Sequence, residues 1–386
     1  MNRVFVSYTG HRIERAKIVH ALREHGINPW RDADNLNLGD ATTDTILAEL
    51  VDCSGLVLWI NRDLFDSEYV RRVELPAIDR AARTRPLRIV PVFDGLSPGE
   101  GSELVSRMGY EIGDNHGHVV DPRAAPSTTA AAIAAEYVRG HVHNAYTAGT
   151  DPVVRMVTYD DTAALREGAV LNFDWRHHVA EGTITEDVEG RLRSALAAST
   201  GALKSAYGTC EVTVAVKAHL SLAVALGHAF SQPTGCTLRL HRPDGDWTVP
   251  AEQAGVPVLC ETTGGLGPVD AGGAAIGVSV TRDVNAGLTE HVAQGNRYRH
   301  RIILSPETGP GRTTVDSSAT ANAWARQVAD VLTATADRHD VDHIALYLAT
   351  PVELAVMIGW WANATGRTKL MDWAKTGPYR RLWEIL

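Results

Sequence analysis

An apolar phrase that occurs twice constrains the fold of this chain more than any other feature of its sequence. The first copy is "HLSLAVALGHAF", His219 to Phe230, and the second is "PVELAVMIGWWA", Pro351 to Ala362. The copies align at a constant offset of 132 residues, as Gly227 and Gly359 show. Each copy follows one predicted strand and precedes another, which makes it the helix of a β-α-β unit. The duplication predicts two related half-domains packed about a pseudo-twofold axis, with a cleft between them.

The starts of the two repeated helices indicate what such a cleft binds. The segment "TPVE", Thr350 to Glu353, has the pattern of a capping box, and "KAHLS" puts Lys217 and His219 at the equivalent start. Helix amino ends attract anions, so two of them facing one cleft predict a site for phosphates. The plainer alternative is a pair of ordinary capped helices with no ligand between the halves.

The first third of the chain has no third copy and instead alternates short buried strands with amphipathic helices. The predicted strands are Arg3 to Tyr8, Ile27 to Trp30, Gly55 to Ile60 and Leu87 to Phe93. This alternation predicts a parallel sheet flanked by helices.

An alanine-rich segment, Asp121 to Val142, predicts the helix that closes this first domain. Its capping candidates are the residues Ser127 to Thr129. The residues that follow include Gly149 and Pro152 and little that can pack, so we place the domain boundary near Asp151.

Size and charge limit the functions of the chain. A chain of 386 residues is longer than one that usually folds around a single hydrophobic core, so two or three domains are expected. A net charge of −9 disfavours binding to long nucleic acid but allows a small anionic ligand in a local positive pocket. No segment resembles a membrane span or a secretory signal, so a cytoplasmic location is expected. Neither the four cysteines nor the histidine pairs have ligand spacing, so no metal or cofactor is expected.

The first third resembles a TIR domain over roughly residues 1–143. The resemblance rests on the ordered segments "VFVSYTG", "INPWRDADNLNLGD", "LVDCSGLVLWINRDLFDSEYVRRVEL" and "RIVPVF". It implies a flavodoxin-like parallel sheet and, as in many bacterial TIR domains, hydrolysis of NAD+. The family's catalytic glutamate then corresponds to Glu74, although Tyr69 replaces the usual Trp and stands five residues before it, where four is commoner. A different helix start would make Glu68 the competing acid.

One carboxylate is enough for this chemistry. Nicotinamide leaves as a neutral ring, so the barrier lies mainly in the positive charge that grows on the ribose, and a carboxylate beside the ribose stabilises it. The alternative for Glu74 is an exposed helix carboxylate paired with Arg71 or Arg72.

The segment Arg31 to Asp40 lies between a predicted strand and a helix, at the sheet edge where open α/β sheets bind ligands. It resembles the loop that gates NAD+ entry in TIR domains. The candidate NAD+ contacts are Tyr8, Trp30, Asp32 and Leu36. Their alternative roles are a core aromatic, an Asx turn and a loop anchor.

The rest of the chain resembles a SAVED domain, a fusion of two CARF-like, Rossmann-like halves that senses cyclic oligonucleotides in bacterial anti-phage systems. The resemblance rests on "NFDWRHHVAEG", the phrase "HLSLAVALGHAF" and "ATPVELAVMIG". The expected domains are therefore TIR at 1–143, a linker at 144–151 and SAVED at 152–386. The order resembles TIR-SAVED effectors of CBASS defence. It implies activation by cyclic tri-adenylate or a relative, and self-association in which neighbouring TIR domains complete each other's active sites.

Basic, hydroxyl and aromatic residues in the second region are candidate contacts for such a ligand. They are Lys217, His219, Arg239, Arg282, Arg299 within the run "RYRHR", Thr350, and Trp360 or its neighbour Trp361. Surface ion pairs and core aromatics are their alternative roles. Two other functions stay open at this point, a non-catalytic TIR adaptor and a nuclease that degrades its own signal.

Overall fold

The computed structural model describes most of the chain. The described residues are 3–7, 12–30, 47–48, 50, 53–64, 66–68, 70–84, 87–110, 117–159, 168–179, 183–251, 257–265, 272–338, 341–363, 365–373 and 379–385. The chain divides into two compact units. The first comprises Met1–Asp151 with Arg166–Phe173 and Gly201–Ala206, and the second comprises the remainder.

The first unit contains a parallel five-stranded sheet in the order β2-β1-β3-β4-β5. This is the flavodoxin-like order, and it confirms the predicted fold class. The strands are β1 (Arg3–Ser7), β2 (Asn28–Trp30), β3 (Gly55–Ile60), β4 (Arg88–Phe93) and β5 (His118–Val119). The helices are α1 (Arg12–Glu24), the 3-10 turn Arg62–Leu64, the π turn Val70–Glu74, α4 (Leu75–Thr84), α5 (Pro98–Arg107) and α6 (Pro126–Thr147).

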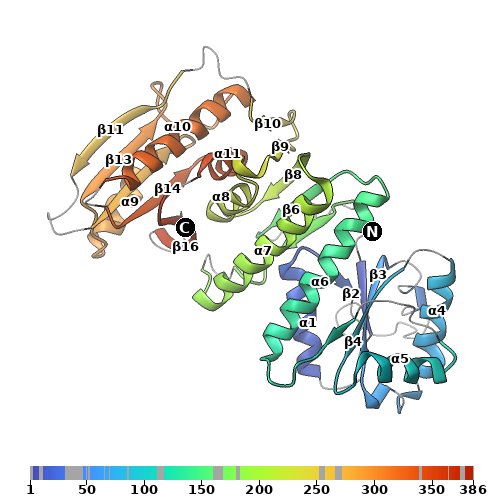
Figure 1. Cartoon of the computed structure of the whole chain (residues 1–386). Coiled ribbons are helices and arrows are strands. Elements are labelled where there is room, and N and C mark those ends of the chain that lie inside the picture. Colours follow the sequence, from blue (N-terminus) through green and yellow to red (C-terminus); the bar gives the residue numbers. More distant parts are fainter. Residues whose placement is uncertain are drawn as a thin grey trace, which may run out of the picture. The chain divides into compact units, whose positions relative to one another are not determined.

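Helices cover both faces of this sheet (Figure 1). Leu56 and Leu58 of β3 belong to a core cluster with Leu75 and Ile78 of α4. On the other face, Gly55 lies so close to Tyr137 of α6 that a Cβ atom there would overlap the phenol ring. α1 packs beside α6 on that second face. Because strand side chains alternate between faces, the two faces of β3 mark two separate layers.

The start and the length of α6 differ from prediction. The N-cap is Ala125, which makes no side-chain capping hydrogen bond, because the proline at residue 126 already starts the helix. Ser127 to Thr129 therefore lie inside the helix, and their predicted capping role is wrong. The helix runs on to Thr147, through the first residues of the predicted linker, before Gly149 turns with a φ of 69°.

The two sheets that follow β5 along the chain repeat one plan, and their residues form the second unit apart from Arg166–Phe173 and Gly201–Ala206, which cluster with the first. The first half contains β6 (Val153–Val157), β7 (Leu171–Asp174), α7 (Glu186–Tyr207), β8 (Glu211–Lys217), α8 (Leu220–Ala229), a 3-10 turn (Gln232–Thr234), β9 (Thr237–Leu240) and β10 (Trp247–Val249). The second half contains β11 (Cys260–Gly265), β12 (Gly273–Ser279), α9 (Asn285–Ala293), β13 (His300–Ser305), α10 (Ser318–Ala336), β14 (His343–Ala349), α11 (Val352–Trp361), β15 (Thr368–Trp373) and β16 (Tyr379–Ile385).

The strand orders of the two sheets correspond. They are β10-β9-β8-β6-β7 and, read from the equivalent edge, β16-β15-β14-β12-β13-β11. In both sheets the strands flanking the repeated helix are parallel, and an antiparallel hairpin strand closes the edge. The predicted duplication of a β-α-β unit is confirmed.

The two repeated helices pack against each other, and glycines bring their backbones together (Figure 1). A Cβ atom on Gly227 would lie 1.9 Å from the carbonyl oxygen of Val356, and one on Gly359 would lie 2.0 Å from that of Val224. Gly227 and Gly359 are equivalent positions of the two copies, 132 residues apart, and so are Val224 and Val356. Each helix therefore makes the same contact to the other, as a pseudo-twofold axis requires. Glycine is needed at both positions because any side chain would force the helices apart.

Candidate functional sites

Glu74 lies at the point where the strand order of the first sheet reverses. Ser7 is the last residue of β1, and it pairs with Leu58 of β3 across that point. The Ser7 hydroxyl donates a hydrogen bond to Oε2 of Glu74, with 2.5 Å between the two oxygens. Ligands of open α/β sheets bind at the carboxyl ends of the strands beside such a reversal. Glu74 therefore stands where this fold class holds ligands.

The π turn Val70–Glu74 accounts for the unusual spacing before Glu74. A π turn takes up one residue more than an α turn, and such turns are frequent at functional sites. Val70 at its start is 3% exposed and Leu75 just after it is 2% exposed, so both ends are held in the core. The π turn therefore accommodates the one extra residue before Glu74, while the side chains of Val70 and Leu75 both stay in the core.

The competing acid, Glu68, faces solvent. It forms an ion pair with Arg72 at 3.0 Å, in which the Glu68 and Arg72 side chains are 66% and 78% exposed. Exposed pairs at this helical spacing contribute only a few tenths of a kcal/mol. Glu68 thus has the exposed, arginine-paired role that was the alternative for Glu74, whereas Glu74 bonds to Ser7.

Trp30 has a core role. Its ring stacks on Phe5 with the centroids 5.2 Å apart, and only 4% of the residue is exposed. The core-aromatic alternative therefore holds for this residue. The other predicted NAD+ contacts, Tyr8, Asp32 and Leu36, lie outside the described residues.

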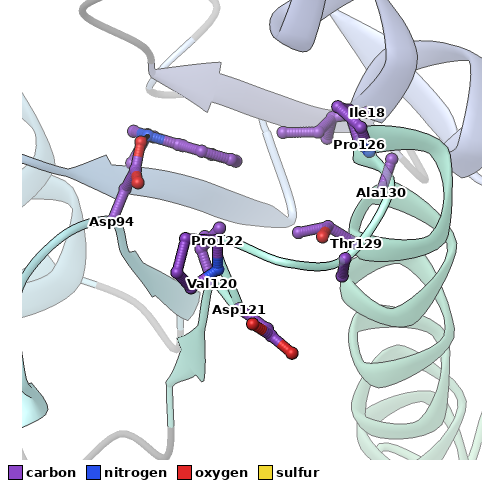
Figure 2. Close-up of a pocket in the computed structure, with 10 residues that line it drawn as sticks. Ile18, Asp94, Val120, Asp121, Pro122, Pro126, Thr129 and Ala130 are labelled. Carbon is purple, nitrogen blue, oxygen red and sulfur yellow. Dashed lines mark hydrogen bonds between the residues drawn. The ribbon is translucent and has the colours of Figure 1, made fainter.

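A pocket of about 170 Å³ lies beside α1 and α6 in the first unit (Figure 2). Asp94 at the end of β4 and Pro122 line one side, and Ile18 of α1 and Thr129 of α6 line the other. Trp59, which alternates with Leu58 along β3, also lines it, and its Nε1 donates to Oδ2 of Asp94 at 3.1 Å. None of its lining residues is a predicted NAD+ contact.

In the second unit, four of the predicted ligand contacts stand at the carboxyl ends of parallel strands. Lys217 ends β8 and is exposed, and His219 immediately precedes α8. Arg282 is exposed shortly after β12, and Thr350 follows β14. The backbone N–H of Thr281 donates to the carbonyl oxygen of Ala349 at 2.7 Å, which ties the ends of β12 and β14 together.

Two exposed aromatic residues stand at the same edges. Tyr159, shortly after β6, is 39% exposed, and Trp373, the last residue of β15, is 42% exposed. The Tyr159 ring stacks on that of His219, with 4.2 Å between centroids. The guanidinium carbon of Arg282 lies 5.3 Å from the centroid of the Trp373 ring. Both aromatics were missed from the sequence, although an aromatic residue just past a predicted parallel strand is the signal that finds them.

A carboxylate lies at the start of each repeated helix, and each makes a contact between the two halves. The N–H of Ser221 in the first turn of α8 donates to Oδ2 of Asp372 at 3.0 Å, and Asp372 comes from the second half. In the first turn of α11, Glu353 accepts from Arg242 of the first half at 3.1 Å. Partial burial of its ring, together with the negative charge of Asp372, raises the pKa of Tyr159 to about 12. These contacts cross between the halves, so the carboxyl edges of the two sheets meet.

The predicted capping box at Thr350 is wrong. The N-cap of α11 is Pro351, which has no side-chain cap, and the Glu353 carboxylate pairs with Arg242 instead. The Thr350 hydroxyl and the Ser221 hydroxyl are both buried without a hydrogen-bond partner. A buried polar atom left in this state costs about 1–3 kcal/mol, and these two hydroxyls lie at equivalent places, beside the starts of α8 and α11.

The three remaining predicted contacts lie elsewhere. Arg239 pairs with Glu211 at the first residue of β8, so it points toward the amino edge of its sheet. Arg299 precedes β13, where its N–H donates to the carbonyl oxygen of Gly273 at the opposite end from Arg282. Trp360 is 3% exposed, and its Nε1 donates to the carbonyl oxygen of Cys236 at 3.0 Å. A buried indole with a backbone partner is a core residue, so it is not placed to stack on a base.

In the part of the chain that the structure describes, no group of three or more His, Cys, Asp or Glu residues is arranged to hold a metal ion. Among the same residues, no helix combines the length and the apolar character that crossing a bilayer requires.

Comparison with known proteins assigns both regions. The model of the SAVED family, described as "SMODS-associated and fused to various effectors sensor domain", matches residues 192–385, and a TIR domain model matches residues 4–110. No curated protein sequence matches the chain.

Two solved structures share its fold over nearly its full length. One is an Acinetobacter baumannii Cap4 SAVED/CARF-domain containing receptor with the cyclic trinucleotide 2'3'3'-cAAA, at a TM-score of 0.52 and 11% identity, covering 98% of this chain and 99% of that one. The other is the same receptor with 3'3'3'-cAAA, at a TM-score of 0.50 and 10% identity with the same coverage. The chain belongs to the SAVED sensor family and carries a TIR domain ahead of the sensor.

Proposed function

We propose that this protein is a signal-gated NAD+ hydrolase: the second unit binds a cyclic oligonucleotide, the chains associate, and the TIR domain then cleaves NAD+. The observation that carries the enzymatic part is the Ser7–Glu74 hydrogen bond at the strand-order reversal of the first sheet. It puts a carboxylate, held by a neighbouring strand, at the edge where this fold class binds nucleotides.

Glu74 supplies charge in this reaction. The bond between the ribose C1' and the nicotinamide nitrogen breaks, and the electron pair leaves with the nicotinamide as a neutral ring. The Glu74 carboxylate stabilises the positive charge that develops on the ribose. Water then adds to C1' and loses a proton, which gives ADP-ribose. No acid is needed for the leaving group, so one carboxylate is sufficient.

The sensor part is supported by the chemistry gathered at the joined carboxyl edges of the two sheets. Arg282 and Lys217 supply positive charge for phosphates. The exposed rings of Tyr159 and Trp373 supply faces on which bases stack. The unpartnered hydroxyls of Ser221 and Thr350 supply hydrogen bonds. Phosphate, base and hydroxyl recognition in one place favour a small nucleotide ligand, and the internal twofold favours a cyclic one.

The test is to mix the purified full chain with NAD+ and a panel of cyclic di- and trinucleotides, including 3'3'3'-cAAA and 2'3'3'-cAAA. Nicotinamide release and particle size are measured for each. We expect one or a few compounds to trigger both. Particle growth without nicotinamide would reject the hydrolase and support the TIR adaptor. Recovery of the added compound as shortened linear products would instead show a nuclease.

Trp373 should contribute strongly to ligand affinity. Stacking on an aromatic ring is worth about 1–3 kcal/mol per base, so Trp373→Ala is expected to weaken binding of the activating compound by about tenfold to a hundredfold. Isothermal titration calorimetry measures this directly. Tyr146→Ala, which removes a ring that is 50% exposed in the first unit, is the matched control and should leave affinity unchanged. Equal affinities for Trp373→Ala and the parent protein would remove Trp373 from the site.

A further inference from the structure

We propose that Ser7 is a positioning residue for Glu74: its hydroxyl fixes the direction of the carboxylate, and the π turn brings that carboxylate within its reach. This inference rests on the proposed NAD+ hydrolase. It adds a residue whose role comes from a contact across the fold, between a strand and a helix start that are 67 residues apart in the chain.

Burial shows that Ser7 acts through Glu74. Ser7 is 1% exposed, so its side chain does not reach a substrate that binds beyond the strand ends. Its hydroxyl hydrogen points to Oε2 of Glu74, and the oxygens are 2.5 Å apart, which is the short range of a charge-assisted hydrogen bond. Holding one carboxylate oxygen sets the direction of the other, because the two share one rigid plane.

The π turn supplies the other half of the positioning. Val70 and Leu75 fix its two ends in the core, while Arg71 and Arg72 between them are exposed. The backbone of Glu74 is thereby held, and the remaining freedom lies in its side-chain rotamers. A glutamate loses considerable rotamer entropy when it is ordered. The Ser7 hydrogen bond selects one rotamer before the substrate arrives, so less ordering remains for the reaction itself.

The expected signature is a loss of turnover without a loss of substrate binding. We expect Ser7→Ala in the full chain, with NAD+ and the compound that activates the parent protein, to lower kcat by about tenfold to a hundredfold. KM should stay within about twofold, because Ser7 does not touch the substrate. Ser7→Cys keeps the size and a weak donor, so its kcat should fall between those of Ser7→Ala and the parent.

A matched control separates positioning from simple stability. Ser54 donates its hydroxyl to the carbonyl oxygen of Arg3 at 2.9 Å, at the amino edge of the same sheet. Ser54→Ala loses a similar hydrogen bond, so it should lower Tm as Ser7→Ala does while leaving kcat intact. If Ser7→Ala does not fold, Ser7→Cys takes its place in the comparison.

These measurements separate the role of Ser7 from the proposed NAD+ hydrolase activity. An active parent protein whose kcat is unchanged in the folded Ser7 variant would overturn the role of Ser7 alone. An equal fall of kcat in Ser54→Ala would do the same, because it would show a general effect of sheet stability. A parent protein that releases no nicotinamide with any compound of the panel would overturn both.

Discussion

Replacing Glu74 with Gln is expected to lower nicotinamide release by about a thousandfold, which is the scale of removing a group that stabilises transition-state charge. Gln keeps the length of the side chain, and its amide oxygen still accepts the Ser7 hydroxyl, so the geometry of the site should persist. What disappears is the negative charge beside the ribose. Because Glu74 belongs to the first unit, ligand affinity and ligand-induced particle growth should match those of the parent protein.

Glu68→Gln is the control for this experiment. It makes the same substitution on a neighbouring acid that is 66% exposed and paired with Arg72, so activity should fall by less than about twofold. Nicotinamide release and light scattering, measured on both variants with the same activating compound, separate catalysis from assembly. Full activity in Glu74→Gln, or a large loss in Glu68→Gln, would show that the catalytic acid has been assigned to the wrong residue.

The alternating pattern of the first third predicts its strands well but cannot predict the contact that holds Glu74. The predicted strand Gly55 to Ile60 coincides with β3, and the described part of the predicted strand Arg3 to Tyr8 is β1, Arg3–Ser7. Helix prediction from sequence assumes a constant number of residues per turn, and the π turn Val70–Glu74 has more residues per turn than an α-helix. The pairing of Ser7 with Glu74 depends on how the helix docks on the sheet, which no local pattern encodes.

The same limit explains which candidate ligand residues of the second unit stand at strand ends and which do not. Lys217 and Thr350 follow directly from strand ends, each at the carboxyl edge of its own sheet. Trp360 was misjudged because α11 is apolar around its whole circumference, and periodicity does not show which face of such a helix is covered. Asp372 meets α8 only because the two halves pack together, so its contact is a property of the duplication and not of either copy.

Gly359→Ala is expected to destabilise the sensor strongly. Among the described sensor glycines whose backbone is not left-handed, only the equivalent change at Gly227 should cost as much. The new Cβ would lie 2.0 Å from the carbonyl oxygen of Val224 and 2.8 Å from the backbone nitrogen of His228. Neither atom belongs to a flexible side chain, so the helices must separate. We expect a loss on the order of 3 kcal/mol in the free energy of unfolding and weaker ligand binding, because these helices join the two sheets whose edges form the site.

Gly190→Ala provides the matched control for Gly359→Ala. Gly190 also lies within a helix, α7, but nothing stands within 4 Å of a Cβ atom there. Alanine favours the helix, so this variant should gain about 0.5–1 kcal/mol. Thermal unfolding of both proteins, followed by calorimetry, gives the two signs directly. A Gly359→Ala protein as stable as the parent would mean that the helices do not pack backbone to backbone. The joined carboxyl edges, and the ligand site proposed between the halves, would then lose their structural basis.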